Sequence, residues 1–215
     1  MSPRPQIDHI RRPQLLAAAA EVIAERGVAA TRIADVAERA GTSAPGVLYW
    51  FDSKDQLLAE ALTAAEDRFD ESLTGRLEAM GGPGERLRLL IEASAENYDW
   101  TLWMELWTRA LRDPRMRATR QRLDDRWRGQ IAHDVRAGQA AGAFADHGPP
   151  ERIALILASL LDGLALQATL GDPQVAPAQM RDLALEIVEL LLGSELPPLS
   201  DQESAREREM LVEGE

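Results

Sequence analysis

Three tryptophans have the most distinctive spacing of any side chains in this sequence. Trp100, Trp103 and Trp107 lie at i, i+3 and i+7, which places them on one face of a helix, and Met104 lies beside them. Indole faces attract organic cations, and nearby carboxylates add charge attraction. The same spacing is also typical of a helix that fills a core with aromatic side chains. The stripe therefore indicates either a binding cage or a packed core.

Two residues further along the chain belong to the same hypothesis. Trp127 adds an aromatic face, and Asp162 lies inside an otherwise apolar segment. A carboxylate in such a segment needs a partner, which an internal arginine, a capped backbone or a bound amine can supply. The candidate ligand-binding residues are Trp100, Trp103, Met104, Trp107, Trp127 and Asp162.

The other chemistry-bearing residues form no catalytic pattern. His9, His133 and His147 share no metal-ligand spacing, and the chain has no cysteine. No glycine-flanked serine or phosphate-cradling glycine loop occurs. Carboxylates are abundant, as expected for solvated helix faces. The sequence therefore predicts no catalytic activity, no metal site and no cofactor.

A different kind of pattern precedes the tryptophans, in TRIADVAERAGTSAPGVLYWFDSK at residues 31–54. Thr31 can cap a first short helix, which Gly41 stops sharply. Ser43 can cap a second helix, with Pro45 in its first turn, where a missing N–H costs nothing. Two short helices joined in this way predict a helix-turn-helix, an element that places one helix in the DNA major groove.

The side chains around the second helix of this motif, about residues 43–51, are the candidate contacts to double-stranded DNA. We expect the bases to be read from this helix and the phosphates to be gripped from its two ends. The candidates are Thr31, Arg32, Thr42, Ser43, Ala44, Pro45, Gly46, Tyr49, Trp50 and Lys54.

At these residues the chain resembles the tetracycline-repressor (TetR) family of bacterial transcription regulators. The likeness runs from RRPQLLAAAAEVIAERG through IADVAERAG and FDSKDQLL to Leu62. The family usually carries a phosphate-contacting tyrosine three residues before Phe51, where this chain has Leu48 followed by Tyr49. The resemblance implies a DNA-binding repressor, with the contact moved to Tyr49. If the contact is lost instead, the alternative is a helical ligand-binding or scaffold protein without operator binding.

The carboxy-terminal part is similar to the choline-responsive repressors of the betaine pathway within that family. The likeness rests on WTLWMELWTRALRDPRMR, VRAGQAAGAF and LLDGLALQ. It implies a small-molecule effector that is cationic or amphipathic, such as a choline-like quaternary amine or a polyamine. A hydrophobic ligand in an apolar pocket suits the Trp and Met content nearly as well.

The net charge of −12 is unevenly distributed along the chain. Residues 1–56 hold seven basic and seven acidic side chains, so the remainder carries the whole negative charge. A neutral head on an acidic body predicts DNA binding that depends on local arginines and lysines and has a modest electrostatic share.

Gly and Pro punctuate the chain between segments of helical periodicity, and no alternating strand pattern appears. The sequence therefore predicts an all-α fold, with an N-terminal three-helix DNA-binding head and a larger C-terminal helical bundle for ligand binding and dimerisation. Beyond the head, we expect one helix at about 53–80, a second that begins near residue 85 and a third that contains the tryptophans. A long helix that ends near residue 142 follows, and the last two are expected at 150–170 and 177–192. The predicted domains are 1–52 for DNA binding, 53–196 for effector binding and dimerisation, and 197–215 as an acidic tail.

The last two helices are apolar around most of their circumference. A helix of this kind needs burial on two sides, which a four-helix interface between two copies would provide. The alternative is that they form the centre of a monomeric bundle. A two-fold dimer would read palindromic operator half-sites about 34 Å apart, or a multiple of that distance.

No signal segment and no uninterrupted apolar run of membrane-spanning length is present. We therefore expect a cytoplasmic protein without a membrane partner.

Overall fold

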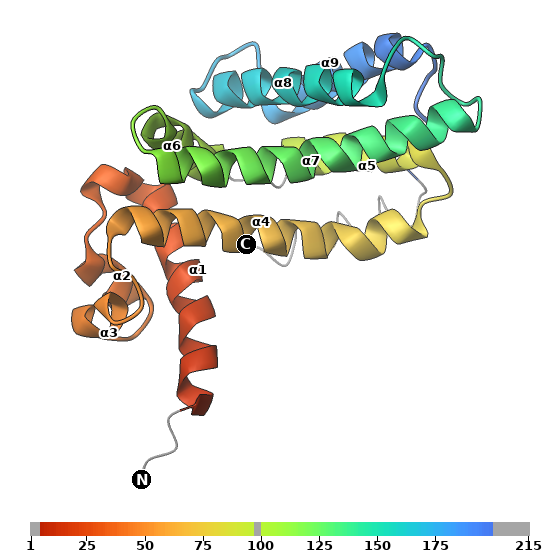
Figure 1. Cartoon of the computed structure of the whole chain (residues 1–215). Coiled ribbons are helices and arrows are strands. Elements are labelled where there is room, and N and C mark those ends of the chain that lie inside the picture. Colours follow the sequence, from red (N-terminus) through yellow and green to blue (C-terminus); the bar gives the residue numbers. More distant parts are fainter. Residues whose placement is uncertain (1–4, 97–99, 200–215) are drawn as a thin grey trace. The chain divides into compact units, whose positions relative to one another are not determined.

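The structure is a computed structural model that describes residues 5–96 and 100–199, and all regular secondary structure in this part of the chain is helical (Figure 1). The predicted all-α fold is confirmed. The helices are α1 (Pro5–Ala30), α2 (Ile33–Arg39), α3 (Ala44–Leu48), α4 (Lys54–Ala79), α5 (Pro83–Glu96), α6 (Trp100–Ala110), α7 (Pro114–Ala140), α8 (Pro150–Thr169) and α9 (Pro177–Leu192). The acidic tail lies outside the described residues from residue 200 onward.

These helices form two compact units, each described here by itself. The first unit comprises Met1–Glu71 and Asp99–Asp124, and the second comprises Ser72–Tyr98 and Asp125–Glu215. Helices α4 and α7 therefore begin in the first unit and end in the second. The packing groups α6 with the predicted head, because α6 lies against α1. The boundary predicted after residue 52 separates DNA binding from effector binding, which packing alone does not test, and it stays a prediction.

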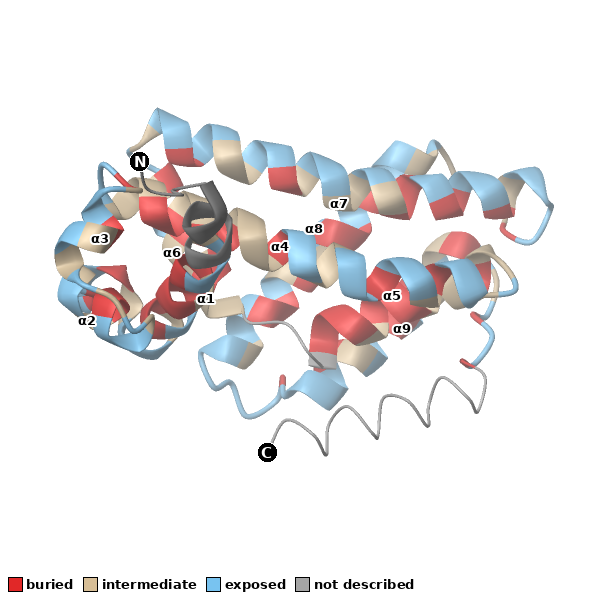
Figure 2. Cartoon of the chain, turned by 90° about the horizontal axis from the view of Figure 1, so that it is seen from below, coloured by how far each residue is buried: buried red, intermediate tan, exposed pale blue. Residues whose placement is uncertain are grey.

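The helix-turn-helix forms as its punctuation predicts. Gly41 has a positive φ of 64° and ends the turn after α2. Ser43 caps α3 by accepting a hydrogen bond from the Gly46 amide at 3.3 Å. Phe51 is fully buried behind α3, while the outer surface of α2 and α3 is largely exposed (Figure 2).

The predicted cap at Thr31 is wrong. The N-cap residue of α2 is Arg32. Thr31 is only 2% exposed, and its hydroxyl donates to the Gly27 carbonyl oxygen at 2.8 Å. The hydroxyl is thus turned back toward α1, where the same Gly27 carbonyl oxygen also accepts from the Thr31 amide at 3.1 Å.

Gly27 interrupts α1 in a backbone region that only glycine adopts readily, with φ 71° and ψ 158°. The helix resumes for one further turn to Ala30. A Cβ atom at this position would lie 2.7 Å from Oε1 of Glu105 on α6. The break is therefore also the point where α6 approaches the head closely.

The start of α4 is fixed immediately after the helix-turn-helix. Ser53 accepts a hydrogen bond from the Gln56 amide at 3.1 Å, and the Gln56 side chain accepts one from the Asp52 amide at 2.8 Å. One of these bonds satisfies an amide of the first turn, which has no partner within the helix, and the other holds the residue just before the helix. From there α4 buries Leu58 and Leu62 in the first unit.

In the second unit, α9 packs between α8 and α5, and buried residues of α5 and α9 face one another (Figure 2). Asp134 on α7 is 1% exposed and accepts from Nε of Arg86 at 2.6 Å and from Gln130 at 3.1 Å. Arg86 also donates to the Leu77 carbonyl oxygen at 3.0 Å. This arginine thereby ties the last turn of α4, α5 and α7 into one core.

The end of α7 generates a stability test. The Phe144 ring packs directly on Gly138, where a Cβ atom would lie 2.0 Å from the ring, whereas a Cβ at Gly129 on the same helix meets nothing within 4 Å. We expect Gly138→Ala to lower the free energy of unfolding by about 1–3 kcal/mol, because a buried ring must move. Urea unfolding followed by circular dichroism measures this.

Gly129→Ala is the matched control, which should leave stability unchanged or raise it by up to about 1 kcal/mol through helix propensity. Equal effects of the two substitutions would contradict the packing argument.

Candidate functional site

The predicted DNA contacts lie around α3, and all except Thr31 reach the surface of the first unit. Tyr49 is 77% exposed and Leu48 is 54% exposed. The Tyr49 ring meets Trp50 edge-on, with centroids 5.4 Å apart. Arg32, Ser43, Pro45 and Tyr49 are exposed, and Thr42, Ala44, Gly46, Trp50 and Lys54 are partly exposed.

Contacts behind α3 hold this surface in place. The Arg12 guanidinium lies 5.8 Å from the centre of the Phe51 ring and forms an ion pair with Glu60 on α4. Lys54 donates to the Val28 carbonyl oxygen at 3.5 Å, so the first residue of α4 touches the segment after the break in α1. The recognition helix is thereby positioned from both α1 and α4.

Not every head arginine is available to a phosphate. Arg39 is bound by Glu21 at 2.8 Å and by Glu25 at 2.9 Å. The hydrogen bond from Arg39 holds the pKa of Glu25 below its usual value, so the pair stays charged at neutral pH. By contrast, Arg32 bonds to Asp35 through its backbone amide at 2.9 Å, and its side chain is exposed.

The tryptophan stripe is partly core and partly polar. Trp103 is 6% exposed, and its indole Nε1 donates to Oε1 of Glu66 on α4 at 2.9 Å. The Trp107 ring lies 6.0 Å from that of Trp103 with an interplanar angle of 52°. Trp100, Met104 and Trp107 are partly exposed. The structure thus brings two indole planes and one carboxylate together within the first unit.

Trp127 and Asp162 are in the second unit, on α7 and α8, and both are partly exposed. The structure therefore groups four of the six predicted ligand-binding residues on α6, and the participation of these two stays a prediction.

Glu66 is the functional candidate that sequence reasoning missed. It is 8% exposed and lies four residues after Leu62, on the stripe of α4 that buries Leu58 and Leu62. A carboxylate at a stripe position is a departure from amphipathic patterning. The sequence could have indicated Glu66 by this departure, because a carboxylate is rarely buried without a bonding partner.

Helix α6 also reaches the beginning of α4 directly. Arg109, in the last turn of α6, forms an ion pair with Asp55 in the first turn of α4. Arg117 donates to the Ala110 carbonyl oxygen at 3.2 Å and so closes the end of α6. The helix that carries the tryptophans is therefore bonded to α4 at both Glu66 and Asp55.

A large apolar surface remains open on α8 and α9. By length and composition alone α8 could cross a membrane, with a mean hydropathy of 1.4 over an 18-residue window, and 39% of that window is buried. Ser159 and Gly163 lie exposed in the middle of α8, so this surface is flat enough for a second helix to approach. The exposed large apolar residues on these helices are Leu155, Ile156, Leu166, Leu170, Leu183 and Leu190.

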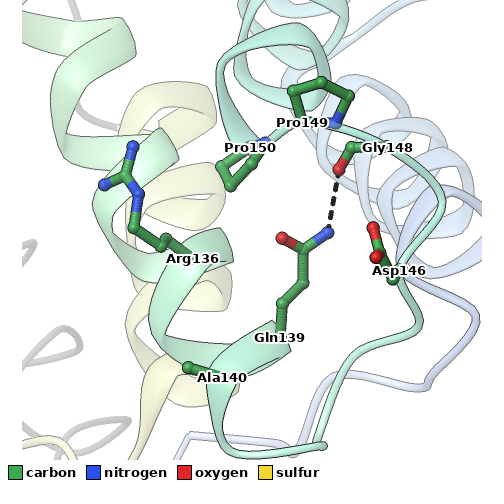
Figure 3. Close-up of a pocket in the computed structure, with 7 residues that line it drawn as sticks. All are labelled: Arg136, Gln139, Ala140, Asp146, Gly148, Pro149 and Pro150. Carbon is green, nitrogen blue, oxygen red and sulfur yellow. Dashed lines mark hydrogen bonds between the residues drawn. The ribbon is translucent and has the colours of Figure 1, made fainter.

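A pocket of about 530 Å³ lies at the connection between α7 and α8 (Figure 3). Gln139 donates to the Gly148 carbonyl oxygen across it at 3.0 Å, and Arg136 is paired with Glu151. Two of its polar side chains are thus already bonded to protein groups, and Asp146 also lines the pocket. Among the described residues, no group of three or more His, Asp or Glu side chains is arranged to hold a metal ion.

Comparison with known proteins agrees with this geometry. Residues 15–61 match the family of bacterial regulatory proteins of the tetR type, and residues 83–193 match the C-terminal domain of BetI-type transcriptional repressors. The HTH-type transcriptional regulator BetI 1 of Chromohalobacter salexigens is 28% identical, over 87% of this chain and 93% of that protein. BetI of Burkholderia thailandensis is 30% identical, over 89% of this chain and 98% of that protein.

A solved structure is similar over nearly its whole length. A putative transcriptional regulator from Saccharomonospora viridis, crystallised in complex with choline, has a TM-score of 0.77 and 31% identity, covering 85% of this chain and 96% of that one. The chain belongs to the TetR family and is a ligand-responsive, DNA-binding transcriptional repressor with a BetI-type C-terminal domain.

Proposed function

We propose that this repressor works as a cytoplasmic homodimer that releases a palindromic operator when it binds a small choline-like cation. The observation that carries the choice of effector is the contact between Trp103 and Glu66, because it joins an aromatic surface to a carboxylate. Attraction between a cation and an indole face is strongest in such partly desolvated surroundings. The choline bound by the Saccharomonospora viridis regulator supports the same class of ligand.

The DNA side of the proposal follows from the exposed surface of α3. Ser43, Pro45 and Gly46 lie at the start of the helix, where side chains of a recognition helix meet base edges. Arg32, Tyr49 and Lys54 flank that helix and at least partly reach the surface, which supports them as the phosphate contacts of the proposal. Thr31 leaves this set because its side chain is buried. Tyr49 takes the place of the tyrosine expected at position 48.

The dimer side of the proposal rests on the open face of α8 and α9. A second copy packed on this face would remove Leu166 and Leu190 from water, and the small residues Ser159 and Gly163 would let helices approach closely. A two-fold arrangement of this kind is the common geometry for soluble homodimers, and it gives the two heads matching orientations on a palindrome.

The effector signal has a short route to the head. Because α6 is bonded to Glu66 and to Asp55 of α4, a ligand that moves the Trp103 ring also acts on the first turn of α4. That turn follows α3 after only a few residues. For release to occur, the ligand must bind the DNA-free arrangement more tightly, and a coupling of about 1–3 kcal/mol gives roughly 5–150-fold weaker operator binding.

Fluorescence anisotropy with a labelled duplex from beside the protein's own gene tests the whole proposal. At fixed salt, we expect saturable binding that choline weakens roughly 5–150-fold, while a scrambled duplex binds weakly with or without choline. Spermidine and an aliphatic alcohol serve as comparison ligands. Operator binding that no cation alters would refute the choline-like effector, and affinity equal to that for scrambled DNA would refute an operator at this place.

The phosphate contacts predict a salt effect. Lys54→Ala should weaken binding to all duplexes alike and reduce the slope of log affinity against log salt by about one unit per protomer, since each lost phosphate contact releases one fewer counterion. Arg39→Ala is the control, because Arg39 is already neutralised by Glu21 and Glu25. Identical slopes for Lys54→Ala and the unmodified protein would remove Lys54 from the contact set.

The dimer predicts that one charge on α8 is disruptive. Leu166→Glu places a carboxylate in the proposed interface, where burial without a partner costs several kcal/mol, so the dimer should dissociate about 100-fold more readily. Sedimentation equilibrium measures this constant. Leu111→Glu alters an equally apolar, exposed residue on the connection between α6 and α7 and should leave the dimer intact. A stable Leu166→Glu dimer would place the interface elsewhere.

A further inference from the structure

The connection between α6 and α7 concentrates positive charge in an otherwise acidic chain. Residues 109–122 hold six arginines and a single acidic residue, Asp113, whereas the whole chain has a net charge of −12. This stretch belongs to the first unit, which also contains the helix-turn-helix. The α6–α7 corner is formed by the exposed arginines of the stretch, which are Arg112, Arg115, Arg117 and Arg122.

The charge of the α6–α7 corner is not compensated by carboxylates in the described part of the chain. Arg117 donates to the Ala110 carbonyl oxygen at 3.2 Å, and Arg122 donates to a threonine hydroxyl on α4 at 3.5 Å. Both acceptors are neutral, so these two guanidinium groups keep their full charge. Within the described residues, Arg112 and Arg115 are bonded only through their backbone amides, and their side chains are exposed.

Arg115 lies at a place where helix stability disfavours a cation. It is in the first turn of α7, and the unpaired amides of a helix start carry partial positive charge. Asp113 supplies the acidic group that suits this end, because its carboxylate accepts from the Arg115 amide at 2.7 Å. Local stability therefore does not explain the arginine side chain, whereas an anion bound from outside the protein would.

The end of α6 places the α6–α7 corner beside the start of α4. Arg109 forms an ion pair with Asp55, the residue after the proposed phosphate contact Lys54. Arg112 follows in the next turn, and its amide donates to the Arg109 carbonyl oxygen at 2.9 Å. The corner therefore begins one turn after a residue that is paired with the start of α4.

The helix-turn-helix itself offers little uncompensated positive charge. Several arginines around it are already bound to glutamate or aspartate, and DNA phosphates are bound best by cations whose charge is still available. The paired arginines are Arg12, Arg26 and Arg39. The α6–α7 corner thus carries, in the same unit, the kind of charge that these pairs remove from the head.

We infer that the α6–α7 corner is a second contact surface for duplex DNA, where Arg112 and Arg115 bind backbone phosphates next to those gripped by Lys54. This inference rests on the proposed operator binding and deepens it, because it adds contacts outside the helix-turn-helix. Phosphate contacts do not depend on base sequence. They therefore raise the affinity and its salt dependence without changing which operator is recognised.

Salt dependence tests the contact in the full-length protein. Anisotropy is measured at several salt concentrations, on the duplex from beside the protein's own gene and on a scrambled duplex. For the double variant Arg112→Gln, Arg115→Gln we expect at least about tenfold weaker binding at low salt and a slope smaller by about two units per protomer, because two fewer counterions are released. Arg152→Gln is the matched control, because it removes an exposed arginine from the first turn of α8 in the second unit. It should leave the slope unchanged.

A charge reversal separates DNA binding from folding. An acidic side chain suits the positive end of a helix, so Arg115→Glu should unfold at the same temperature as the unmodified protein or at a higher one. It should nevertheless bind both duplexes more weakly than Arg115→Gln, since it repels phosphates. A structural role for Arg115 would instead lower the unfolding temperature of both variants and would overturn the inference.

Neutral methylphosphonate linkages, placed one at a time in the duplex, locate the contact. Neutralising a linkage bound by the α6–α7 corner should weaken binding of the unmodified protein and leave binding of the double variant unaffected. We expect these linkages to adjoin those that behave in the same way for Lys54→Ala. Equal responses of the unmodified protein and the double variant at every linkage would contradict a phosphate contact by the corner.

The outcomes separate the inference from the proposed function. If Lys54→Ala lowers the slope and the double variant does not, the corner does not bind DNA, and the proposed operator binding stands. If the double variant binds DNA more tightly, the arginines hold an acidic segment of the protein instead, and the inference is likewise overturned. If the unmodified protein binds both duplexes alike, the proposed operator position fails, while a smaller slope of the double variant on both supports the corner.

Discussion

The packing of α6 against α1 and α4 is the contact on which the rest of this structure depends. One helix carries the aromatic stripe, donates an indole hydrogen bond to Glu66 and ends in an arginine bonded to Asp55. These two bonds lie eleven residues apart on α4, at its first turn and at its middle. The same helix therefore combines the groups suited to a ligand with the groups that hold the start of α4. In the proposed mechanism the effector signal needs no long relay, because α6 contacts the start of α4 directly.

Two buried carboxylates show how context decides the role of one chemical group. Asp134 forms an ion pair with Arg86, which also donates a hydrogen bond to the Leu77 carbonyl oxygen in the last turn of α4. Removing either partner would strand a charge in the core. Glu66 accepts a hydrogen bond from the indole N–H of Trp103, which orients the carboxylate toward α6. The last turn of α4 is thus held through a buried ion pair, and the middle of α4 through a hydrogen bond from an indole.

Sequence reasoning reached the helices more reliably than the site. Gly41, Ser43 and Ser53 carry local signals, a left-handed stop and two caps, and local signals are readable without knowing the tertiary structure. The cap predicted at Thr31 was wrong, because its hydroxyl can bond either to an amide of α2 or to the Gly27 carbonyl of α1. Packing, which sequence reasoning does not see, selects the carbonyl. Glu66 was overlooked because its partner, Trp103, lies 37 residues away in sequence. The pairing of α6 with α1 is equally non-local.

The backbone at Gly27 sets a limit on how this protein can diverge. Its φ and ψ lie where residues with a Cβ are strongly disfavoured, and α6 approaches at that same point. The break in α1 therefore coincides with the point where the Glu105 side chain of α6 meets the head. Glu105 is not one of the tryptophans, so this contact and the aromatic stripe are made by different residues of α6. Position 27 is therefore constrained twice, by backbone conformation and by packing, and we expect glycine to be kept there as the protein diverges.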